Sequence, residues 1–245
     1  MADAQSVRVL EIKQGIFEHN DRKADKLRER LHNQGIYLLN LMSSPGSGKT
    51  TTLLATIKAL RNECSIAVME ADIDSDVDAR TIAQVGVPSI QLHTGGMCHL
   101  DAAMTEQGLD GLLKVAGAES AEFAAGPSVH PTATPDLVIL ENVGNLVCPA
   151  EFDTGATANA MIWSVPEGDD KALKYPLMFS VCDVVLINKI DTLSVFDDFD
   201  LDFAIHSVHQ RNPNATVIPI SAKTGEGIDV WAEWLRADME RVKSL

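Results

Sequence analysis

Seven short apolar runs recur along the chain, and longer segments of helical character separate them. Runs of this length suit strands that are buried on both faces, and their alternation with helices is typical of parallel strands joined by crossover connections. We therefore predict a three-layer α/β domain with a mostly parallel sheet. Ligands of such sheets bind at the carboxyl ends of the strands, so functional residues are expected in the loops after these runs. The runs are IYLLNLM, SIAVME, PSIQL, LVILENV, AMIWSV, VVLIN and TVIPI.

The two ends of the chain are predicted to be helical. Residues 7–32 combine apolar and charged side chains in a way that suits a helix packing on the sheet, so we expect residues 1–34 to form an N-terminal helical extension. Near the C-terminus, apolar residues recur at helical spacing, which predicts a helix facing the core. The segment 116–135 is rich in Ala, Gly and Pro and predicts a flexible surface insertion.

Composition narrows the classes of partner. The chain has 245 residues and a formal net charge of −15, which disfavours nucleic acid and anionic membranes because both attract basic patches. The N-terminal segment lacks the apolar core of a signal peptide, and no run approaches the roughly 18 apolar residues of a membrane span, so a cytoplasmic location is expected. The cysteines are better candidates for metal binding or burial than for disulfides. Cys64 and Cys182 are predicted to be ordinary core cysteines.

The stretch SSPGSGKTT follows the first apolar run and nearly matches the phosphate-binding loop G-x-x-x-x-G-K-[ST] of nucleoside triphosphatases. Ser43 stands where the first glycine is expected, a position at which a small residue can serve. The N–H groups of such a loop and the start of the following helix point at phosphate, and the hydroxyl after the lysine binds Mg²⁺. Thr50 is thus a predicted Mg²⁺ contact. The residues predicted to bind phosphate are Gly46, Ser47, Gly48, Lys49, Thr50 and Thr51.

Two later motifs indicate that the base is guanine. In NKID, at the end of an apolar run, the Asp191 carboxylate can accept hydrogen bonds from both N1–H and the 2-amino group of guanine. Adenine lacks this pair of donors and would leave the carboxylate uncompensated, which discriminates strongly against it. The motif SAK follows another run and is suited to closing over the base. We therefore predict a GTPase domain over residues 35–245, with base-binding residues Asn188, Lys189, Asp191, Ser221, Ala222 and Lys223.

Acidic residues after two other strands are candidates for hydrolysis. Glu141 ends a run and Gly144 follows three positions later, which resembles the D-x-x-G of GTPases with Glu in place of Asp. Such residues contact Mg²⁺, directly or through water, and sense the γ-phosphate. The carboxylates in EADIDSDVD would repel one another without a cation. Asp72 is predicted to contact Mg²⁺ and Asp76 to orient the attacking water, so that the predicted catalytic residues are Lys49, Asp72, Asp76 and Glu141.

A second metal site is predicted from Cys98, His99 and Cys148. Thiolate and imidazole together suit Zn²⁺ or Ni²⁺ far better than Mg²⁺ or Ca²⁺. Both segments follow strands at the edge of the sheet that carries the nucleotide loops. Three ligands are one short of a closed structural zinc site, so either an exchangeable ligand or a second subunit completes it. His93 and Asp101 are further candidates, as ligands or as acceptors for a ligand.

Several longer motifs resemble those of the HypB family, the nickel-inserting GTPases of hydrogenase maturation. They are SSPGSGKTT, CHLD, ENVGNLVCPAEFD, SVPEGDDKALKYP and NKID, and the resemblance spans nearly the whole chain from about Val7. Family members commonly carry S-x-P-G-x-G-K-T, which accounts for Ser43. The resemblance implies a slow GTPase of the SIMIBI class that uses Mg²⁺ and cycles between GTP and GDP. It also implies a homodimer promoted by GTP or metal.

The same resemblance implies partners and a role for the cysteines. Together with the nickel accessory protein HypA, such a GTPase delivers Ni²⁺ to the large-subunit precursor of a [NiFe]-hydrogenase. Cys98, His99 and Cys148 would then bind Ni²⁺ or Zn²⁺ at the dimer interface. The chain carries neither the N-terminal CxxCGC-type nickel motif nor the histidine-rich stretch of some members, which leaves this interface site. Because Cys148 follows the γ-phosphate sensor, nucleotide state can alter metal affinity.

Three alternatives remain open at this point. The urease accessory GTPase also delivers nickel, but its metal motif is Cys-Pro-His, whereas Ala150 follows Cys148 and Pro149 here. A GTP-dependent switch with a purely structural zinc site would use the same cysteines and histidine without delivery. A general regulatory or translational GTPase would need basic surface for RNA, which this acidic chain does not offer.

Overall fold

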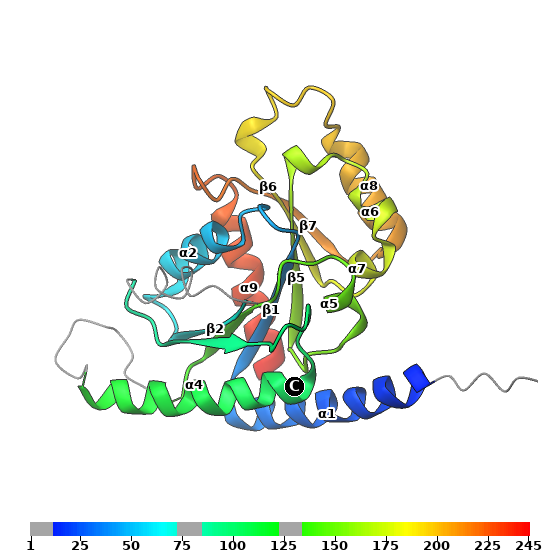
Figure 1. Ribbon diagram of the computed structural model, residues 1–245. Helices are drawn as coiled ribbons and strands as arrows, with labels where there is room; N and C mark the ends of the chain where they lie inside the picture. Colours follow the sequence, from blue (N-terminus) through cyan, green and yellow to red (C-terminus); the bar gives the residue numbers. More distant parts are fainter. Residues whose placement is uncertain (1–11, 73–84, 123–133) are drawn as a thin grey trace, which may run out of the picture.

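The computed structural model describes residues 12–72, 85–122 and 134–245, and within them the chain forms a seven-stranded sheet (Figure 1). Each expected apolar run overlaps one strand, and every neighbouring pair is parallel in the order β3-β2-β4-β1-β5-β6-β7. The predicted α/β fold class is therefore confirmed. The strands are β1 Tyr37–Ser43, β2 Ile66–Asp72, β3 Ser89–His93, β4 Leu137–Glu141, β5 Ala158–Ser164, β6 Val184–Asn188 and β7 Thr216–Pro219.

Helices cover both faces of the sheet, which explains why its inner strands β1, β2, β4, β5 and β6 are largely apolar. Side chains of α2 and α9 form one core cluster with one face of the strands. On the other face, α1 and α4 pack at one end of the sheet, and α6, α7 and α8 pack at the other. The described α-helices are α1 Ile12–Gln34, α2 Lys49–Leu60, α4 Ala102–Glu122, α5 Cys148–Glu151, α6 Lys171–Lys174, α7 Pro176–Ser180, α8 Leu201–Arg211 and α9 Ile228–Lys243.

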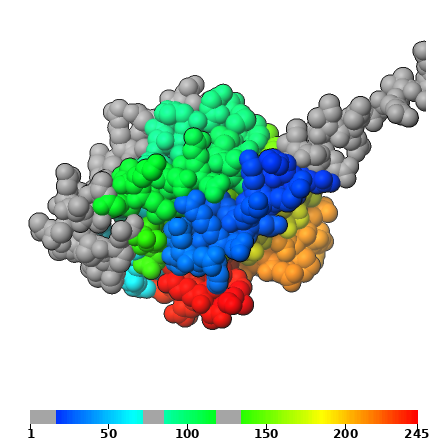
Figure 2. Space-filling model, turned by 90° about the horizontal axis from the view of Figure 1, so that it is seen from below, coloured from blue at the N-terminus to red at the C-terminus, as the bar shows by residue number. Residues whose placement is uncertain are grey.

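The helix α1 lies beside α4 along the same side of the molecule, as Figures 1 and 2 both show. Leu27 and Leu31 of α1 are buried against this part of the core. The prediction of an N-terminal helix that packs on the sheet is thus confirmed over Ile12–Gln34, while its expected start at Val7 lies outside the described residues. The predicted C-terminal helix is α9, whose Trp231 and Leu235 are fully buried.

The predicted insertion at 116–135 begins within α4, because this helix continues to Glu122. Most of the rest of this segment, residues 123–133, lies outside the described residues. Among the helices that the structure describes, none has the length and apolar character needed to cross a membrane.

The parallel register places the ends of the strands along one edge of the sheet. Glu141, the last residue of β4, pairs with Glu70 of β2, and two residues farther along β2 Asp72 pairs with His93 of β3. On the other side of β1, Asn188 at the end of β6 pairs with Ser164 at the end of β5. The loops that carry the predicted nucleotide and metal residues therefore leave the sheet from the same edge.

Candidate functional site

The predicted phosphate-binding loop connects β1 to α2. Gly46 and Gly48 have φ angles of 77° and 98°, in the left-handed region that glycine adopts without strain. Ser43 is the last residue of β1 and is fully buried, and its Oγ donates to Ser44 O at 2.9 Å. The position therefore has extended backbone, which explains why a serine can stand where the motif has glycine. Lys49 and Thr50 begin α2, so the start of the helix points into the loop region.

Asn188 connects the three predicted nucleotide motifs. Its Nδ2 donates to Ser47 O at 2.9 Å, and its Oδ1 accepts from Lys189 N at 2.8 Å and Ala222 N at 3.0 Å. The side chain is only 2% exposed, so these bonds use a buried amide. Lys189, at a φ of 65°, also donates from Nζ to Gly46 O at 2.7 Å. Asn188 and Lys189 thus hold the phosphate-binding loop against the predicted base-binding loops.

We expect Gly48→Ala to weaken guanine-nucleotide binding at least about tenfold, because two effects coincide. The φ of 98° is strained for alanine, and a Cβ at Gly48 would lie 2.4 Å from Asn188 Nδ2. The new methyl group would displace the amide that holds the loop. Binding of a fluorescent GDP analogue measures the effect, and Gly35→Ala is the matched control: its φ is 70° but a Cβ there meets nothing within 4 Å. Equal affinities for both variants would rule out this role of Asn188.

Of the predicted base-binding residues, Asn188 ends β6, and the others lie in the segments that follow β6 and β7. Asp191 is exposed, and its Oδ1 accepts from Ser221 Oγ at 2.7 Å. Ser221 is fully buried and its Oγ also accepts from Thr224 N at 3.2 Å, whereas Lys223 is exposed. The Asp191 carboxylate is therefore held in place by Ser221 while remaining accessible to a ligand.

Glu141 lies close to Lys49, the lysine predicted to bind phosphate, and to Thr50, whose hydroxyl is predicted to bind Mg²⁺. Its Oε1 is 3.8 Å from Lys49 Nζ and 3.5 Å from Thr50 Oγ1, and the residue is 3% exposed. Gly144 lies against the same loop, since a Cβ there would be 3.4 Å from Pro45 and 3.5 Å from Lys49 Nζ. A buried carboxylate beside a hydroxyl is a donor set that suits Mg²⁺.

The structure says little about the predicted roles of Asp72, Asp76 and Thr51. Asp72 is the last residue of β2, at the same edge of the sheet as Glu141, and its side chain lies outside the described part of the chain. Asp76 lies outside the described residues altogether. Thr51 is exposed on the first turn of α2.

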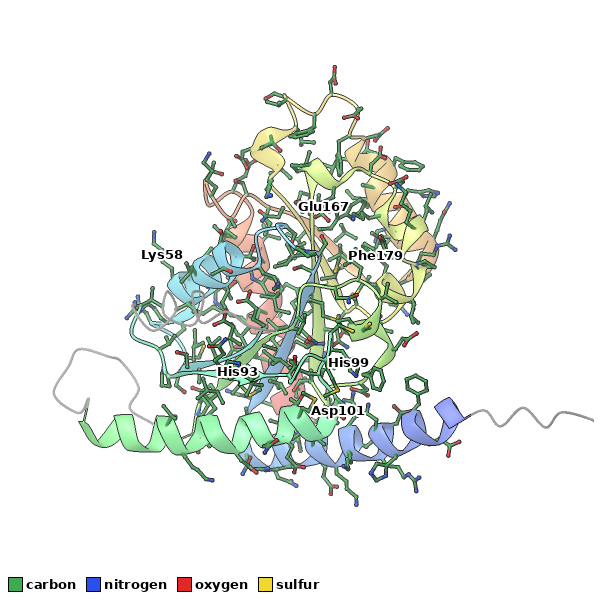
Figure 3. All side chains as sticks on the ribbon, viewed as in Figure 1. Lys58, His93, His99, Asp101, Glu167 and Phe179 are labelled. Atoms are coloured by element: carbon green, nitrogen blue, oxygen red, sulfur yellow. The ribbon has the colours of Figure 1, made fainter. Side chains whose placement is uncertain are left out.

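Glu167 contacts the phosphate-binding loop and was assigned no role from the sequence. Its Oε1 is hydrogen-bonded to Ser44 Oγ and lies 3.3 Å from Lys171 Nζ, while Oε2 accepts from Ser164 N at 2.9 Å. It lies near the upper end of the sheet in Figure 3. Ser164 and Glu167 form a capping box, and the S-x-x-E spacing after an apolar run was the signal for that local structure. The local sequence around Glu167 does not predict the contact with Ser44, because Ser44 is 123 residues away.

The predicted metal ligands lie together. Donor atoms of Cys98, His99 and Cys148 are all within 4.8 Å of one another, and the two Sγ atoms are 2.8 Å apart. All four cysteines of the chain are described and are free thiols. The neighbouring Cys98 thiol, followed by burial, raises the pKa of Cys148. A bound cation would offset this effect because it favours the thiolate.

An aromatic contact holds the His99 ring. It stacks on Phe152 with ring centroids 3.9 Å apart and 13° between the planes, and Phe152 also packs on Phe17 of α1 at 5.1 Å. His99 Nδ1 is buried and has no hydrogen-bond partner among the described residues. A buried nitrogen without a partner, next to two thiols, fits a transition-metal ion.

The other candidates for metal binding lie outside this cluster. In Figure 3, Asp101 lies near His99 at the start of α4, whereas His93 lies apart from them at the end of β3. The Asp101 carboxylate accepts from Met104 N at 2.8 Å and so caps α4.

Cys182 is buried in the core, and burial raises the pKa of half-buried Cys64 to about 11. The assignment of Cys64 and Cys182 as core cysteines agrees with these positions.

Comparisons with known proteins agree with this arrangement. Residues 37–219 match the family described as CobW/HypB/UreG, nucleotide-binding domain. The hydrogenase maturation factor HypB of Azotobacter chroococcum is 42% identical over 93% of this chain and 68% of its own length. The hydrogenase/urease maturation factor HypB of Helicobacter pylori strain J99 is 39% identical over 92% of this chain and 86% of its own.

A solved structure gives the same assignment. The crystal structure of HypB from Helicobacter pylori in complex with nickel superposes with a TM-score of 0.79 at 37% sequence identity, covering 91% of this chain and 96% of that one. Both the sequence and the fold therefore match over nearly the whole chain. The protein belongs to the CobW/HypB/UreG family of nucleotide-binding proteins and, within it, to the HypB hydrogenase maturation factors.

Proposed function

We propose that this protein is a GTP-hydrolysing metallochaperone that binds Ni²⁺ at Cys98, His99 and Cys148 and delivers it during maturation of a [NiFe]-hydrogenase. The observation that carries the proposal is the convergence of these three donors at the edge of the sheet that bears the nucleotide loops. The nickel complex of the Helicobacter pylori relative supports the choice of metal. We further propose that residues 1–34 are a helical extension of a GTPase domain formed by 35–245.

The proposed nucleotide cycle assigns roles to the residues of the phosphate site. Lys49 binds the phosphates, and Asp191 selects guanine through its accessible carboxylate. Thr50, Glu141 and Asp72 would hold Mg²⁺, which when bound supplies positive charge to the β- and γ-phosphates. Gly144 N–H reports the γ-phosphate, since Gly144 already lies against Pro45 and Lys49. Asp76 remains the proposed residue for orienting the attacking water.

A short, internally bonded turn connects this sensor to a metal ligand. Asn145 Oδ1 accepts from Val147 N at 2.8 Å and from Cys148 N at 3.3 Å, so the four residues after Gly144 form a compact unit. Because this turn is rigid, a displacement of Gly144 on hydrolysis would also displace Cys148. A flexible segment would not transmit the movement. Cys98 and His99 follow a different strand, so the movement would change the distances among the three ligands. Different metal affinities in the two nucleotide states would follow.

We propose that a second copy of the chain completes the metal site. Three donors leave at least one coordination position for another ligand. The residues next to the ligand cysteines, Met97 and Val147, are exposed by 43% and 53%, which places apolar side chains around the cluster. Release would then accompany separation of a GTP- or metal-promoted dimer. The recipients proposed are a HypA-type accessory protein and the hydrogenase large-subunit precursor.

Two other functions use the same site. A GTP-dependent switch would keep zinc at the cluster as a structural ion, and its metal affinity would not respond to nucleotide. Delivery to urease is supported by the name of the Helicobacter pylori relative, which is a hydrogenase/urease maturation factor. Against it, Ala150 stands where the Cys-Pro-His motif of the urease accessory GTPase has histidine.

An anaerobic Ni²⁺ titration of the whole chain tests the proposal. It is run with saturating GDP and with a non-hydrolysable GTP analogue, both in the presence of Mg²⁺. We expect the Ni²⁺ affinity or the Ni²⁺-to-protein ratio to differ between the two states, by a factor of about five or more, the lower end of typical coupling between sites. Coincident curves would favour the structural-zinc switch and would contradict nickel delivery.

A further inference from the structure

We propose that Asn20 of α1 is a positioning residue of the metal site, because its one side chain connects the two segments that carry the ligands. Its Oδ1 accepts from Ala102 N at 3.0 Å, and its Nδ2 donates to Asp153 O at 2.9 Å. Asn20 is 6% exposed, so both bonds are shielded from water. The inference rests on the proposed nickel site. It adds to that site a positioning residue from α1, which lies outside the proposed GTPase domain.

The first bond fixes the segment that carries Cys98 and His99. Ala102 is the first residue of α4, and N–H groups in the first turn of a helix lack partners within the helix. The Asp101 side chain serves Met104 N, so the buried N–H of Ala102 depends on Asn20. Because Ala102 follows His99 by three residues, this bond sets where the ligand loop joins α4.

The second bond fixes the segment that carries Cys148. Asp153 lies just beyond the four-residue helix α5, which begins at Cys148 itself. Its carboxylate forms an ion pair with Arg28, which lies two helical turns beyond Asn20 on α1, and it accepts from Gly155 N at 2.9 Å. With its carbonyl bonded to Asn20, Asp153 is held by its backbone and by its side chain. The exit of α5 is therefore held against α1, at the same point as the start of α4.

A parallel contact from α1 reaches the imidazole. Phe17 precedes Asn20 by three residues, a spacing that places both on one face of a helix. Phe17 packs on Phe152, and Phe152 stacks on His99. The orientation of the His99 ring therefore depends on the same helix face that bridges the ligand segments. Groups behind metal ligands that fix ligand orientation in this way usually change metal affinity when they are removed.

The competing interpretation is that Asn20 only anchors α1 to the rest of the protein. Arg30 provides the control, because it also joins α1 to α4 but does so away from the ligand segments. Its guanidinium lies 3.4 Å from Glu106 Oε1 and 2.6 Å from Asp110 Oδ1, in the second and third turns of α4. Arg30→Ala therefore removes anchoring without touching the bridge between Ala102 and Asp153.

The experiment is an anaerobic Ni²⁺ titration of the full chain, with the thiolate-to-nickel absorption band recorded at each step. We expect Asn20→Ala to weaken Ni²⁺ binding by about 10- to 100-fold and to alter the band. Arg30→Ala should stay within about twofold of the wild type, since its ion pairs are partly exposed. Asn20→Asp keeps the acceptor for Ala102 N but loses the donor to Asp153 O, so it should fall between these values. It also keeps the test decisive if the alanine variant does not fold.

The outcomes separate this inference from the proposed function. Binding of a guanine-nucleotide analogue and the thermal unfolding midpoint are measured for every variant. If wild type binds Ni²⁺ and the Asn20 variants bind it equally well, or no worse than Arg30→Ala, the positioning role is wrong and the nickel site stands. If wild type itself does not bind Ni²⁺, the proposed function fails and this inference with it.

Discussion

Replacing Asp191 by asparagine should lower the affinity for GTP at least about a hundredfold, because it places a donor where guanine presents donors. In the native chain the Asp191 carboxylate is held by Ser221 Oγ at 2.7 Å and stays exposed. An asparagine can keep its Oδ1 on Ser221 but then turns an NH₂ group toward guanine N1–H and the 2-amino group. The loss is measured as the dissociation constant of a fluorescent GTP analogue.

The same substitution offers a rescue that a damaged fold could not give. Xanthine carries a carbonyl in place of the guanine 2-amino group and can accept from the asparagine NH₂. We therefore expect Asp191→Asn to bind xanthosine triphosphate more tightly than GTP, while the wild type prefers GTP. Ni²⁺ binding without nucleotide serves as the control and should not change. Unaltered GTP affinity in the variant would show that another group reads the base.

The fold was predictable from the sequence because its inner strands are almost entirely buried, with helices on both faces. The apolar runs of the inner strands are a direct consequence of that burial, and each of the seven runs overlaps one strand. The boundaries were less predictable: β5 begins at Ala158, before the expected run AMIWSV. Asn159 belongs to the strand although it is polar, since its Oδ1 accepts from buried Asn40 Nδ2 at 2.9 Å. A hydrogen bond across the sheet has no signature in the local pattern.

The candidate site also has a part that the sequence predicts and a part that it does not. Residues within one motif, such as Gly48 and Lys49, were predictable because chemistry fixes their spacing along the chain. The approach of Cys98 to Cys148 was predictable only through the fold, since both follow strands that end at one edge. The roles of Asn20 and Glu167 were not predictable, because the contacts that join them to the site, with Ala102, Asp153 and Ser44, reach across 82 to 133 residues. Local sequence patterns therefore do not predict the side chains that connect one motif to another.

Replacing Cys148 by alanine should remove most Ni²⁺ binding, by more than the roughly 100-fold that loss of an outer partner costs. It takes one of three donors from the cluster and leaves Cys98 and His99. GTP affinity should change by less than about twofold, because the turn that leads back to Gly144 is held by Asn145 through backbone N–H groups that alanine retains. Ni²⁺ titration and binding of a fluorescent GTP analogue measure the two affinities separately.

The matched control is Cys64→Ala, which removes another half-buried thiol that lies outside the cluster. It should leave both affinities unchanged. If Cys148→Ala lost GTP binding together with Ni²⁺, the turn after Gly144 would be a shared structural element, and the cysteine could not report nucleotide state to a separate metal site. The expected result is a weaker Ni²⁺ affinity with an unchanged GTP affinity. If the residual Ni²⁺ affinity of the variant is also the same with GDP and with the GTP analogue, then Cys148 is the ligand through which hydrolysis acts on the metal.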